Sequence, residues 1–443
     1  MSNQYIVVEQ SLGLRGQAQL VGAKNAVLVI MASLILAPGK SKLTNVPCSQ
    51  DVFNMIALLE SLGADVFFDP EQNTLEVDTT TLDKYKVCPE IMKKMRASVL
   101  VMGPLLARFG CADIALPGGC VIGARPINYH LTNLKKMNVT FDMSGEFISA
   151  RSTKLKATKI ILEYPSVGAT ENILMAAVLT EGRTKIINAA LEPEVLDLIV
   201  VLKKMGAKIN ILPAVSIEIE GVQGLKPIEH CVMSDRLEAG ALLLAAAVTG
   251  GQIHLPQAPA HAMDMFLIKL QQMGHEVEVG ADDIGINLKA TLRPKAVSFK
   301  TGPYPGFPTD LQAPMMAAQC LAEGTSVIQE TVFENRLLHV HELQKMGALI
   351  KVEHNTATIT GVEQLYGTSV IATDIRASCA LVLAGLAAEG KTVMTGVHHF
   401  KRGYESLDKK LAKLGASIKF KVDDENDFNR FTSKDGRRKC LQK

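Results

Sequence analysis

The segment KKMGAKINI, residues 203–211, decides the fold because its pattern recurs along the whole chain. A helix-forming run ends at Gly206, and an apolar–polar alternation typical of a β-strand follows it. Glycine at this point predicts a helix closed by a residue in the left-handed conformation. Five more segments share the pattern, SLGADVFF, KKMNVTFDM, QQMGHEVEV, QKMGALIKV and AKLGASIKF, with key residues Gly63, Asn138, Gly274, Gly347 and Gly415. Their spacings of 75, 68, 68, 73 and 68 residues indicate six copies of one unit.

A second glycine marks each unit, where a run rich in Ala, Leu and Val ends and a short strand is expected to begin. These glycines are Gly39, Gly110, Gly182, Gly250, Gly324 and Gly390. Apolar residues occupy nearly every side of the preceding helices, which predicts core helices buried under a sheet. A unit of about 70 residues is marginal for an independent core. We therefore expect three units in each of two domains, with a boundary near residue 230.

The starts of the buried helices carry unusual charges. Counting fourteen residues back from each second glycine reaches Asn25, Arg96, Gly168, Arg236, Asp310 and Arg376. Cations at the positive end of a helix are electrostatically unfavourable. The cost is explained if the helix starts face a shared cleft that binds anions. Ion pairs among the repeats, involving neighbours such as Asp235 and Asp374, are the alternative.

The second unit contains the stretch LPGGCVIGARP, residues 116–126. From the end of the short strand to the key residue, this unit takes 22 residues, whereas the other five take 17 to 19. The glycines and prolines exclude regular structure, and Arg125 places a positive charge near Cys120, which favours the reactive thiolate. A loop lengthened in one repeat of six indicates a functional insertion rather than an incidental cysteine.

Composition excludes several classes of protein. The 443 residues carry a formal net charge of +2 and no Trp, so neither a basic field nor aromatic stacking platforms select nucleic acid. The start of the chain is polar, and the longest apolar run, residues 26–37, is too short to span a bilayer. The eight cysteines are scattered without a CxxC motif, so we expect a reduced, cytoplasmic protein. The pairs His339/His341 and His398/His399 do not have metal-ligand spacing on a helix.

The motifs taken together resemble the enolpyruvyl transferase family. They are GAKNA (22–26), MRAS (95–98), LPGGCVIGARP (116–126), SVGAT (166–170), FPTD (307–310), TVFENR (331–336), DIRAS (374–378) and RGYE (402–405). The resemblance implies an α/β (α+β) fold of inside-out, barrel-like architecture with six βαβαββ units, three in each of two domains, and an active site in the cleft between them. We expect residues 1–20 and 234–422 to form domain I, residues 21–233 to form domain II, and residues 423–443 to be a disordered tail.

The branch of the family that this chain most resembles transfers the enolpyruvyl group of phosphoenolpyruvate to the 3-hydroxyl of UDP-N-acetylglucosamine and releases phosphate. That reaction is the first committed step of peptidoglycan synthesis, and with it of cell-wall growth and division. It uses no metal and no organic cofactor. The alternative within the family is transfer to shikimate 3-phosphate, whose branch lacks the cysteine motif. A remote alternative is a non-catalytic repeat protein that binds nucleotides.

The resemblance also implies roles for individual residues. The catalytic residues are Cys120 as proton donor, covalent adduct site and target of fosfomycin, Asp310 as base, and Lys24 and Arg402 beside the phosphate. The expected phosphoenolpyruvate-binding residues are Lys24, Asn25, Arg125, Arg336, Arg376 and Arg402. The expected UDP-N-acetylglucosamine-binding residues are Arg96, Arg125, Pro126, Ile127, Asn128, Tyr129, Pro165, Ser166, Val167, Asp310 and Val332. Asn128 and Tyr164 depart from the family, which often has an aspartate and a basic residue there. We expect small-molecule substrates only, neither nucleic acid nor membrane as partner, and a monomer or weak oligomer.

Overall fold

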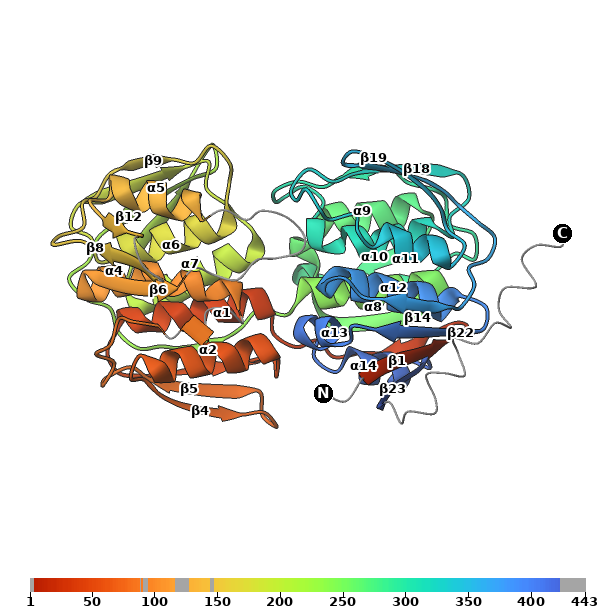
Figure 1. Cartoon of the computed structure of the whole chain (residues 1–443), viewed down its shortest axis with the longest axis horizontal. Helices are drawn as coiled ribbons and strands as arrows, with labels where there is room; N and C mark the ends of the chain where they lie inside the picture. Colours follow the sequence, from red (N-terminus) through yellow and green to blue (C-terminus); the bar gives the residue numbers. More distant parts are fainter. Residues whose placement is uncertain (1–3, 88, 91–94, 116–126, 144–146, 423–443) are drawn as a thin grey trace.

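The computed structural model describes residues 4–87, 89–90, 95–115, 127–143 and 147–422, which form two lobes side by side (Figure 1). Each lobe has its own hydrophobic core. One cluster of buried apolar side chains draws on residues 23–232, and the other draws on residues 6–20 together with residues 237–418. The fold is therefore a two-domain fold. This partition of the core supports the proposed assignment of residues 1–20 to the second lobe.

Each lobe is built from three copies of a βαβαββ unit. The third copy runs continuously through β9 (Lys159–Ile161), α6 (Val167–Ala177), β10 (Arg183–Ile187), α7 (Pro193–Met205), β11 (Lys208–Leu212) and β12 (Ser216–Glu220). Its sheet has the order β11-β12-β10-β9, in which β9 and β10 are parallel and the other pairs are antiparallel. The inner helix α6 thus makes the crossover between the two parallel strands, as such connections require.

The other two units of the first lobe follow the same plan. The first contains β13 (Glu229–Cys231), α1 (Lys24–Ser33), η1 (Leu34–Leu36), β3 (Lys40–Thr44), α2 (Gln50–Ser61), β4 (Asp65–Asp69) and β5 (Thr74–Asp78). The second contains η2 (Arg96–Val101), α4 (Met102–Phe109), β6 (Cys111–Ala115), α5 (Asn128–Lys136), β7 (Thr140–Asp142) and β8 (Phe147–Arg151). Within the described residues, its first strand is reduced to a parallel bridge between Lys86 and Asp113. Because β13 pairs with β3, the end of the lobe closes back onto its beginning.

The second lobe repeats the plan three more times. Its fourth unit has β2 (Arg15–Gln17), α8 (Arg236–Thr249), β14 (Gln252–Pro259), α9 (Asp264–Gln272), β15 (Glu276–Val279) and β16 (Ile284–Lys289). Its fifth has β17 (Phe299–Lys300), η5 (Thr309–Leu311), α10 (Gln312–Gln319), β18 (Thr325–Gln329), α11 (Val340–Lys345), β19 (Leu349–Glu353) and β20 (Thr356–Thr360). Its sixth has β21 (Ser369–Ile371), α12 (Ile375–Ala387), β22 (Lys391–Thr395), α13 (His398–Gly403), α14 (Leu407–Lys413), β23 (Ser417–Val422) and β1 (Gln4–Glu9).

The glycines that define the repeat have the predicted backbone conformation. All six residues at the ends of the outer helices have positive φ, from 70° at Asn138 to 110° at Gly206. The six second glycines, which precede the central strands, also have positive φ, from 68° at Gly250 to 121° at Gly39. Left-handed geometry is accessible to glycine and, at smaller cost than to other residues, to asparagine. The repeat prediction is confirmed at every copy.

The inner helices are buried nearly all round, as their composition predicts. In α8, for example, all residues except Val248 are buried. Two inner helices differ from the expectation because they begin as 3₁₀ turns, η2 before α4 and η5 before α10. Pro104 and Pro314 lie in the first turns of α4 and α10. Proline lacks an N–H and clashes with the carbonyl four residues earlier, so the preceding turn cannot be α-helical.

Two antiparallel segments join the lobes. Ala23 donates its backbone N–H to Met233, and Asp235 donates its own to Val21, at 2.7 and 2.9 Å. Both crossings of the chain therefore lie at one place, and they support the proposed boundaries at residues 20–21 and 233–234.

Candidate active site

Asp310 lies between Arg336 of its own unit and Arg376 of the next unit. Its carboxylate oxygens accept hydrogen bonds from Nη2 of Arg336 at 2.5 Å and from Nη2 of Arg376 at 2.7 Å. The arginine side chains are buried, whereas the Asp310 side chain keeps 25% of its surface exposed. Two charge-assisted hydrogen bonds from guanidinium groups thus anchor this carboxylate. An anchored but accessible carboxylate is suited to accept a proton from a ligand.

Arg376 is fixed from several directions at the start of α12. Asp374 caps the helix by accepting the backbone N–H groups of Arg376 and Ala377 at 2.8 and 3.1 Å. The guanidinium donates its other Nη to the hydroxyl of Tyr404 at 3.0 Å. Burial disfavours the charged form, but the carboxylate of Asp310 raises the pKa of Arg376 well above its ordinary value. Arg376 therefore remains a cation inside the lobe.

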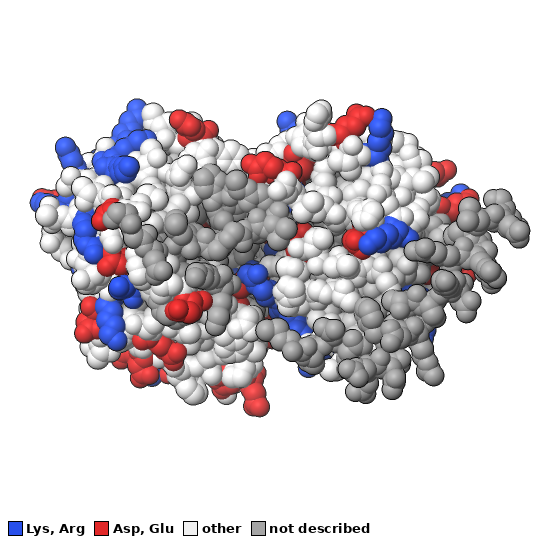
Figure 2. Space-filling model, in the orientation of Figure 1, with Lys and Arg blue, Asp and Glu red and all other residues white. Residues whose placement is uncertain are grey.

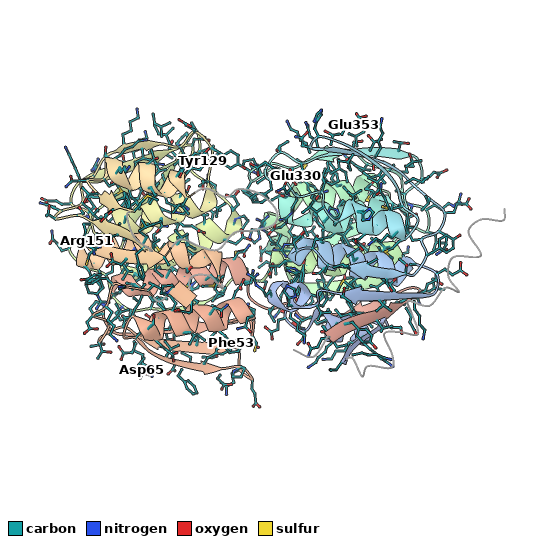
Figure 3. All side chains as sticks on the ribbon, viewed as in Figure 1. Phe53, Asp65, Tyr129, Arg151, Glu330 and Glu353 are labelled. Carbon is teal, nitrogen blue, oxygen red and sulfur yellow. The ribbon has the colours of Figure 1, made fainter. Side chains whose placement is uncertain are left out.

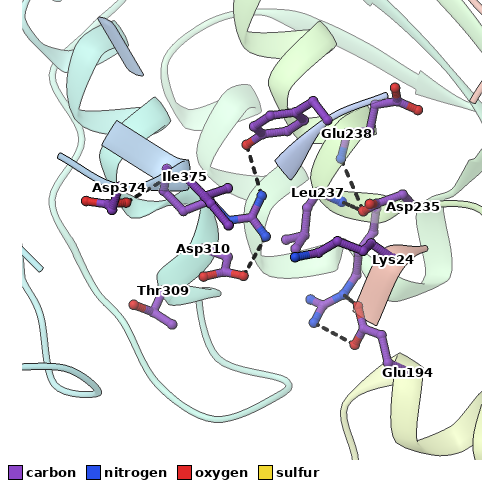
Figure 4. Close-up of polar contacts among 12 residues, drawn as sticks. Lys24, Glu194, Asp235, Leu237, Glu238, Thr309, Asp310, Asp374 and Ile375 are labelled. Atoms are coloured by element: carbon purple, nitrogen blue, oxygen red, sulfur yellow. Dashed lines mark hydrogen bonds and ion pairs between the residues drawn. The ribbon is translucent and has the colours of Figure 1, made fainter. Parts of the chain in front are cut away.

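Lys24 and Arg402, which lie on different lobes, both contact the carboxylate of Asp51. Nζ of Lys24, at the start of α1, lies 2.9 Å from Oδ2 of Asp51. Nε and Nη2 of Arg402, on α13, both lie 3.2 Å from Oδ1 of Asp51. Lys24 and Tyr404 line one pocket between the lobes together with Asp235, and the Lys24 and Asp310 groups are drawn together in Figure 4. The structure thus brings Lys24, Asp310, Arg336, Arg376 and Arg402 into one region.

Arg236 has a different environment from that of an anion-binding group. It forms a two-fold contact with Glu194 of the other lobe, from Nε to Oε1 at 2.9 Å and from Nη2 to Oε2 at 3.1 Å (Figure 4). Burial works against its charge, but Glu194 raises the pKa of Arg236 above its ordinary value. At this helix start, the alternative interpretation of ion pairing among repeats is therefore correct.

The residues expected to bind the nucleotide sugar lie on the first lobe, apart from Asp310 and Val332. Asn128 and Tyr129 begin α5, and Ser166 caps α6 by accepting the N–H of Ala169 at 3.4 Å. His130 and Asn172 join these two helices through a buried contact of 2.8 Å. Figure 3 shows Tyr129 on the edge of its lobe that faces Glu330 of the other.

Other predicted residues fall into two groups. Cys120, Arg125 and Pro126 lie outside the described residues, whereas Arg96, Asn25 and Val332 lie within them. Arg96 is the first residue of η2, as predicted, and Asn25 is exposed at the start of α1. Val332 donates its backbone N–H to Glu330 at 2.8 Å, so a ligand contact at this residue would use its carbonyl oxygen.

Three carboxylates in the region were not predicted from sequence. They are Asp51, Glu194 and Glu330. Glu330 accepts the hydroxyl of Thr309 at 2.9 Å and the N–H groups of Val332 and Phe333, and so ties η5 to the segment that carries Arg336. Asp51 and Glu194 lie in first helical turns, where acidic residues are common, and Glu330 directly follows β18, so their sequence contexts carry no specific signal.

Within the described part of the chain, no three His, Cys, Asp or Glu side chains are grouped to hold a metal ion. His339 instead donates Nδ1–H to the backbone carbonyl of Arg336 at 3.1 Å. None of the helices in the described ranges has the length and apolar character needed to cross a bilayer. Figure 2 shows both basic and acidic side chains at the boundary between the lobes, and both kinds are mixed over the rest of this face.

The whole architecture matches solved enolpyruvyl transferases. The enolpyruvyl transferase NikO from Streptomyces tendae superposes with a TM-score of 0.87 at 23% identity, covering 96% of this chain and 100% of that one. An EPSP synthase from Acinetobacter baumannii superposes with a TM-score of 0.76 at 18% identity, covering 95% and 100%. The two-domain fold of six units is therefore that of the enolpyruvyl transferases.

The sequence assigns the chain to a family within this class. Residues 8–411 match the family described as EPSP synthase (3-phosphoshikimate 1-carboxyvinyltransferase), and the chain belongs to that family. The UDP-N-acetylglucosamine 1-carboxyvinyltransferase of Geotalea uraniireducens is 47% identical over 93% of this chain and 98% of its own length. Its namesake in Geobacter metallireducens is 46% identical over 94% and 98%. The resemblance inferred from the motifs is confirmed.

Proposed function

We propose that this protein transfers the enolpyruvyl group of phosphoenolpyruvate to the 3-hydroxyl of UDP-N-acetylglucosamine, releases phosphate, and so catalyses the first committed step of peptidoglycan synthesis. The observation that carries the proposal is the 46–47% identity, over nearly the full length of both chains, to relatives that bear the name of this activity. The shikimate 3-phosphate alternative has weaker support, because the solved EPSP synthase is only 18% identical. The anchored Asp310 and the convergent cations argue against a non-catalytic nucleotide-binding protein.

The arrangement supports an addition followed by an elimination. Asp310 takes the proton of the attacking hydroxyl, whose oxygen then bonds to C2 of phosphoenolpyruvate. Cys120 supplies the proton that C3 gains in that step. In the elimination, the Cys120 thiolate takes a proton back from C3, the C=C double bond forms again, and the electrons of the C2–O bond leave with phosphate. The proton held by Asp310 then passes to the departing phosphate, so both groups return to their starting protonation states and no other reactant is needed.

Cations stabilise the charges of the phosphate and carboxylate groups. We assign the phosphate to Lys24, Asn25, Arg125 and Arg402. The ammonium group of Lys24 and the guanidinium group of Arg402 already converge on Asp51. We assign the substrate carboxylate to Arg336 and Arg376, which hold a carboxylate of the protein at 2.5 and 2.7 Å. Planar guanidinium groups suit this contact.

We assign the nucleotide sugar to the edge formed by the starts of η2, α5 and α6, opposite Asp310 and Val332. Tyr164 is half-buried near Glu192, and burial, followed by the charge of that glutamate, raises the pKa of its phenol. It therefore remains neutral at physiological pH and offers a hydroxyl where relatives often have a cation. We expect UDP-N-acetylglucosamine to bind through fewer charge contacts at this position.

The test is phosphate release from phosphoenolpyruvate in the presence of UDP-N-acetylglucosamine or of shikimate 3-phosphate. We expect release with the first acceptor only. Release with neither acceptor would refute an enolpyruvyl transferase activity, and release with shikimate 3-phosphate alone would establish the alternative.

The role of Cys120 has its own test. Cys120→Ser should lose turnover, whereas Cys120→Asp should retain much of it, because a carboxyl group can also donate a proton. Fosfomycin should add one covalent adduct at Cys120, detected by peptide mass spectrometry. Wild-type turnover of Cys120→Ser would exclude the thiol as the acid.

We also propose a cytoplasmic location and a monomer or weak oligomer. The location is supported by free thiols at all five cysteines within the described ranges, namely Cys48, Cys111, Cys231, Cys320 and Cys379. Cell fractionation tests the location, and sedimentation velocity at several concentrations tests the oligomeric state.

A further inference from the structure

Among the contacts described for these side chains, Asp51 is the one residue that contacts both Lys24 and Arg402, the two phosphate-assigned cations that lie within the described residues. It lies in the first turn of α2, and only 4% of its side chain is exposed. Its Oδ2 faces Lys24 of its own lobe at 2.9 Å, and its Oδ1 faces two nitrogens of Arg402 at 3.2 Å from the other lobe. A carboxylate with one oxygen on each cation fixes both their separation and their orientation.

The charges around Asp51 leave an excess that an anion can use. Two cations and one carboxylate sum to +1. Burial opposes ionisation of Asp51, yet the charges of Lys24 and Arg402 outweigh it and lower its pKa below the ordinary value. The carboxylate is therefore charged at neutral pH, and it reduces the repulsion between the two cations without cancelling their attraction for a phosphate.

The same two segments make a second contact between the lobes. Glu405, three residues after Arg402, accepts the backbone N–H of Cys48, three residues before Asp51, at 2.5 Å. The Asp51 and Glu405 contacts together hold the end of α13 against the start of α2. Arg402 therefore reaches the position beside Lys24 only when the two lobes are in contact here.

We propose that Asp51 is a positioning residue, which aligns Lys24 and Arg402 from opposite lobes so that both face the phosphate during bond breaking. This proposal rests on the proposed function for the roles of those two cations. A role limited to stabilising the start of α2 is the competing interpretation, because an acidic residue in a first turn favours a helix by itself.

The test compares Asp51→Asn and Asp51→Glu with Ser49→Ala. Ser49 caps α2 by accepting the N–H of Val52 at 3.4 Å, so Ser49→Ala weakens the same helix start and leaves the carboxylate in place. We expect Asp51→Asn to lower kcat at least tenfold with little change in Tm, and Asp51→Glu to give an intermediate kcat. Ser49→Ala should lower Tm and keep kcat within twofold of wild type.

Binding of inorganic phosphate, measured by calorimetry without an acceptor, provides a readout that helix damage would not reproduce. Asp51→Asn raises the local charge from +1 to +2, so phosphate should bind at least as tightly as to the wild type while kcat falls. A kcat within threefold of wild type, or a parallel loss of kcat and phosphate affinity, would overturn the proposal. If Asp51→Asn does not fold, wild-type kcat in Asp51→Glu would overturn it, because one added methylene displaces both cations.

The two proposals fail in distinguishable ways. Absence of turnover by the wild-type protein with UDP-N-acetylglucosamine would refute the function. Phosphate binding to Asp51→Asn would still report on the positioning role, because it requires no acceptor.

Discussion

The ion pair between Glu194 and Arg236 provides a quantitative test of how the two lobes are held together. Its side chains are 6% and 9% exposed, and two parallel hydrogen bonds of 2.9 and 3.1 Å join them. In Glu194→Gln, the amide NH₂ replaces one acceptor and faces a guanidinium donor. Removing one partner of a buried pair leaves an uncompensated charge, at a cost of about 3–5 kcal/mol. For a domain of about 200 residues, a loss of about 3 kcal/mol lowers Tm by roughly 6–12 °C.

Calorimetry on Glu194→Gln measures this loss, with the exposed pair of Lys208 and Glu220 as the control. Lys208→Met should leave Tm unchanged, because both of those side chains are largely in water. The double variant Glu194→Leu/Arg236→Met should recover most of the lost stability, since apolar residues of similar size can replace a buried pair. An unchanged Tm for Glu194→Gln would refute the reasoning. So would a Tm loss in the double variant equal to the summed losses of the two single variants.

Three further predictions concern histidine titration, backbone conformation and helix capping. Burial lowers the pKa of His275 from 6.5 to about 4. As the pH falls from 6.5 to 4, the imidazole is protonated in the unfolded state before it is protonated in the folded state, so the free energy of unfolding should fall by up to about 3 kcal/mol. His275→Asn keeps an acceptor for the N–H of Thr291 and should flatten that part of the urea-denaturation profile; an unchanged slope would contradict the assignment. Gly206 has φ of 110° and no atom within 4 Å of an added Cβ, so Gly206→Ala should cost about 1–2 kcal/mol from backbone strain alone, and Gly206→Asn less; equal urea midpoints would disprove this. Asp374→Ala removes the cap of α12, which should cost about 1 kcal/mol and raise the KM for phosphoenolpyruvate by displacing Arg376; an unaltered KM would separate the cap from the site.

The repeat could be predicted from sequence because it depends on local backbone conformation. A positive φ at the end of a helix restricts the residue to glycine or asparagine, so Gly63, Asn138 and their equivalents are visible without any knowledge of tertiary contacts. The count back to the helix starts also held, because each inner helical segment, with its leading 3₁₀ turn included, begins within one residue of the counted position. The 3₁₀ starts were detectable in principle from Pro104 and Pro314, whose effect is local as well.

The charge partners could not be predicted in the same way. Asp51 and Arg402 are separated by 351 residues, and Glu194 and Arg236 by 42. Nothing in the neighbouring sequence of either carboxylate distinguishes a partner across the lobes from an ordinary acidic residue in a first helical turn. Arg236 shows the consequence: its position in the repeat matches that of Arg376, but its carboxylate partner Glu194 belongs to the other lobe, whereas Asp310 belongs to the same lobe as Arg376. Pairing between lobes is decided by the three-dimensional arrangement of the units.

The first strand of the chain has a consequence for biosynthesis. β1 lies between β22 and β23, with Ile6 opposite both Met394 and Phe420. Its neighbours are thus synthesised almost 400 residues later, which takes a ribosome roughly 20–80 s at 5–20 residues per second. The lobe formed by residues 23–232 has all the strands of its own sheets, β13 included, long before that time. Folding during translation is therefore expected to begin with residues 23–232, while β1 stays unpaired until β22 and β23 have been synthesised.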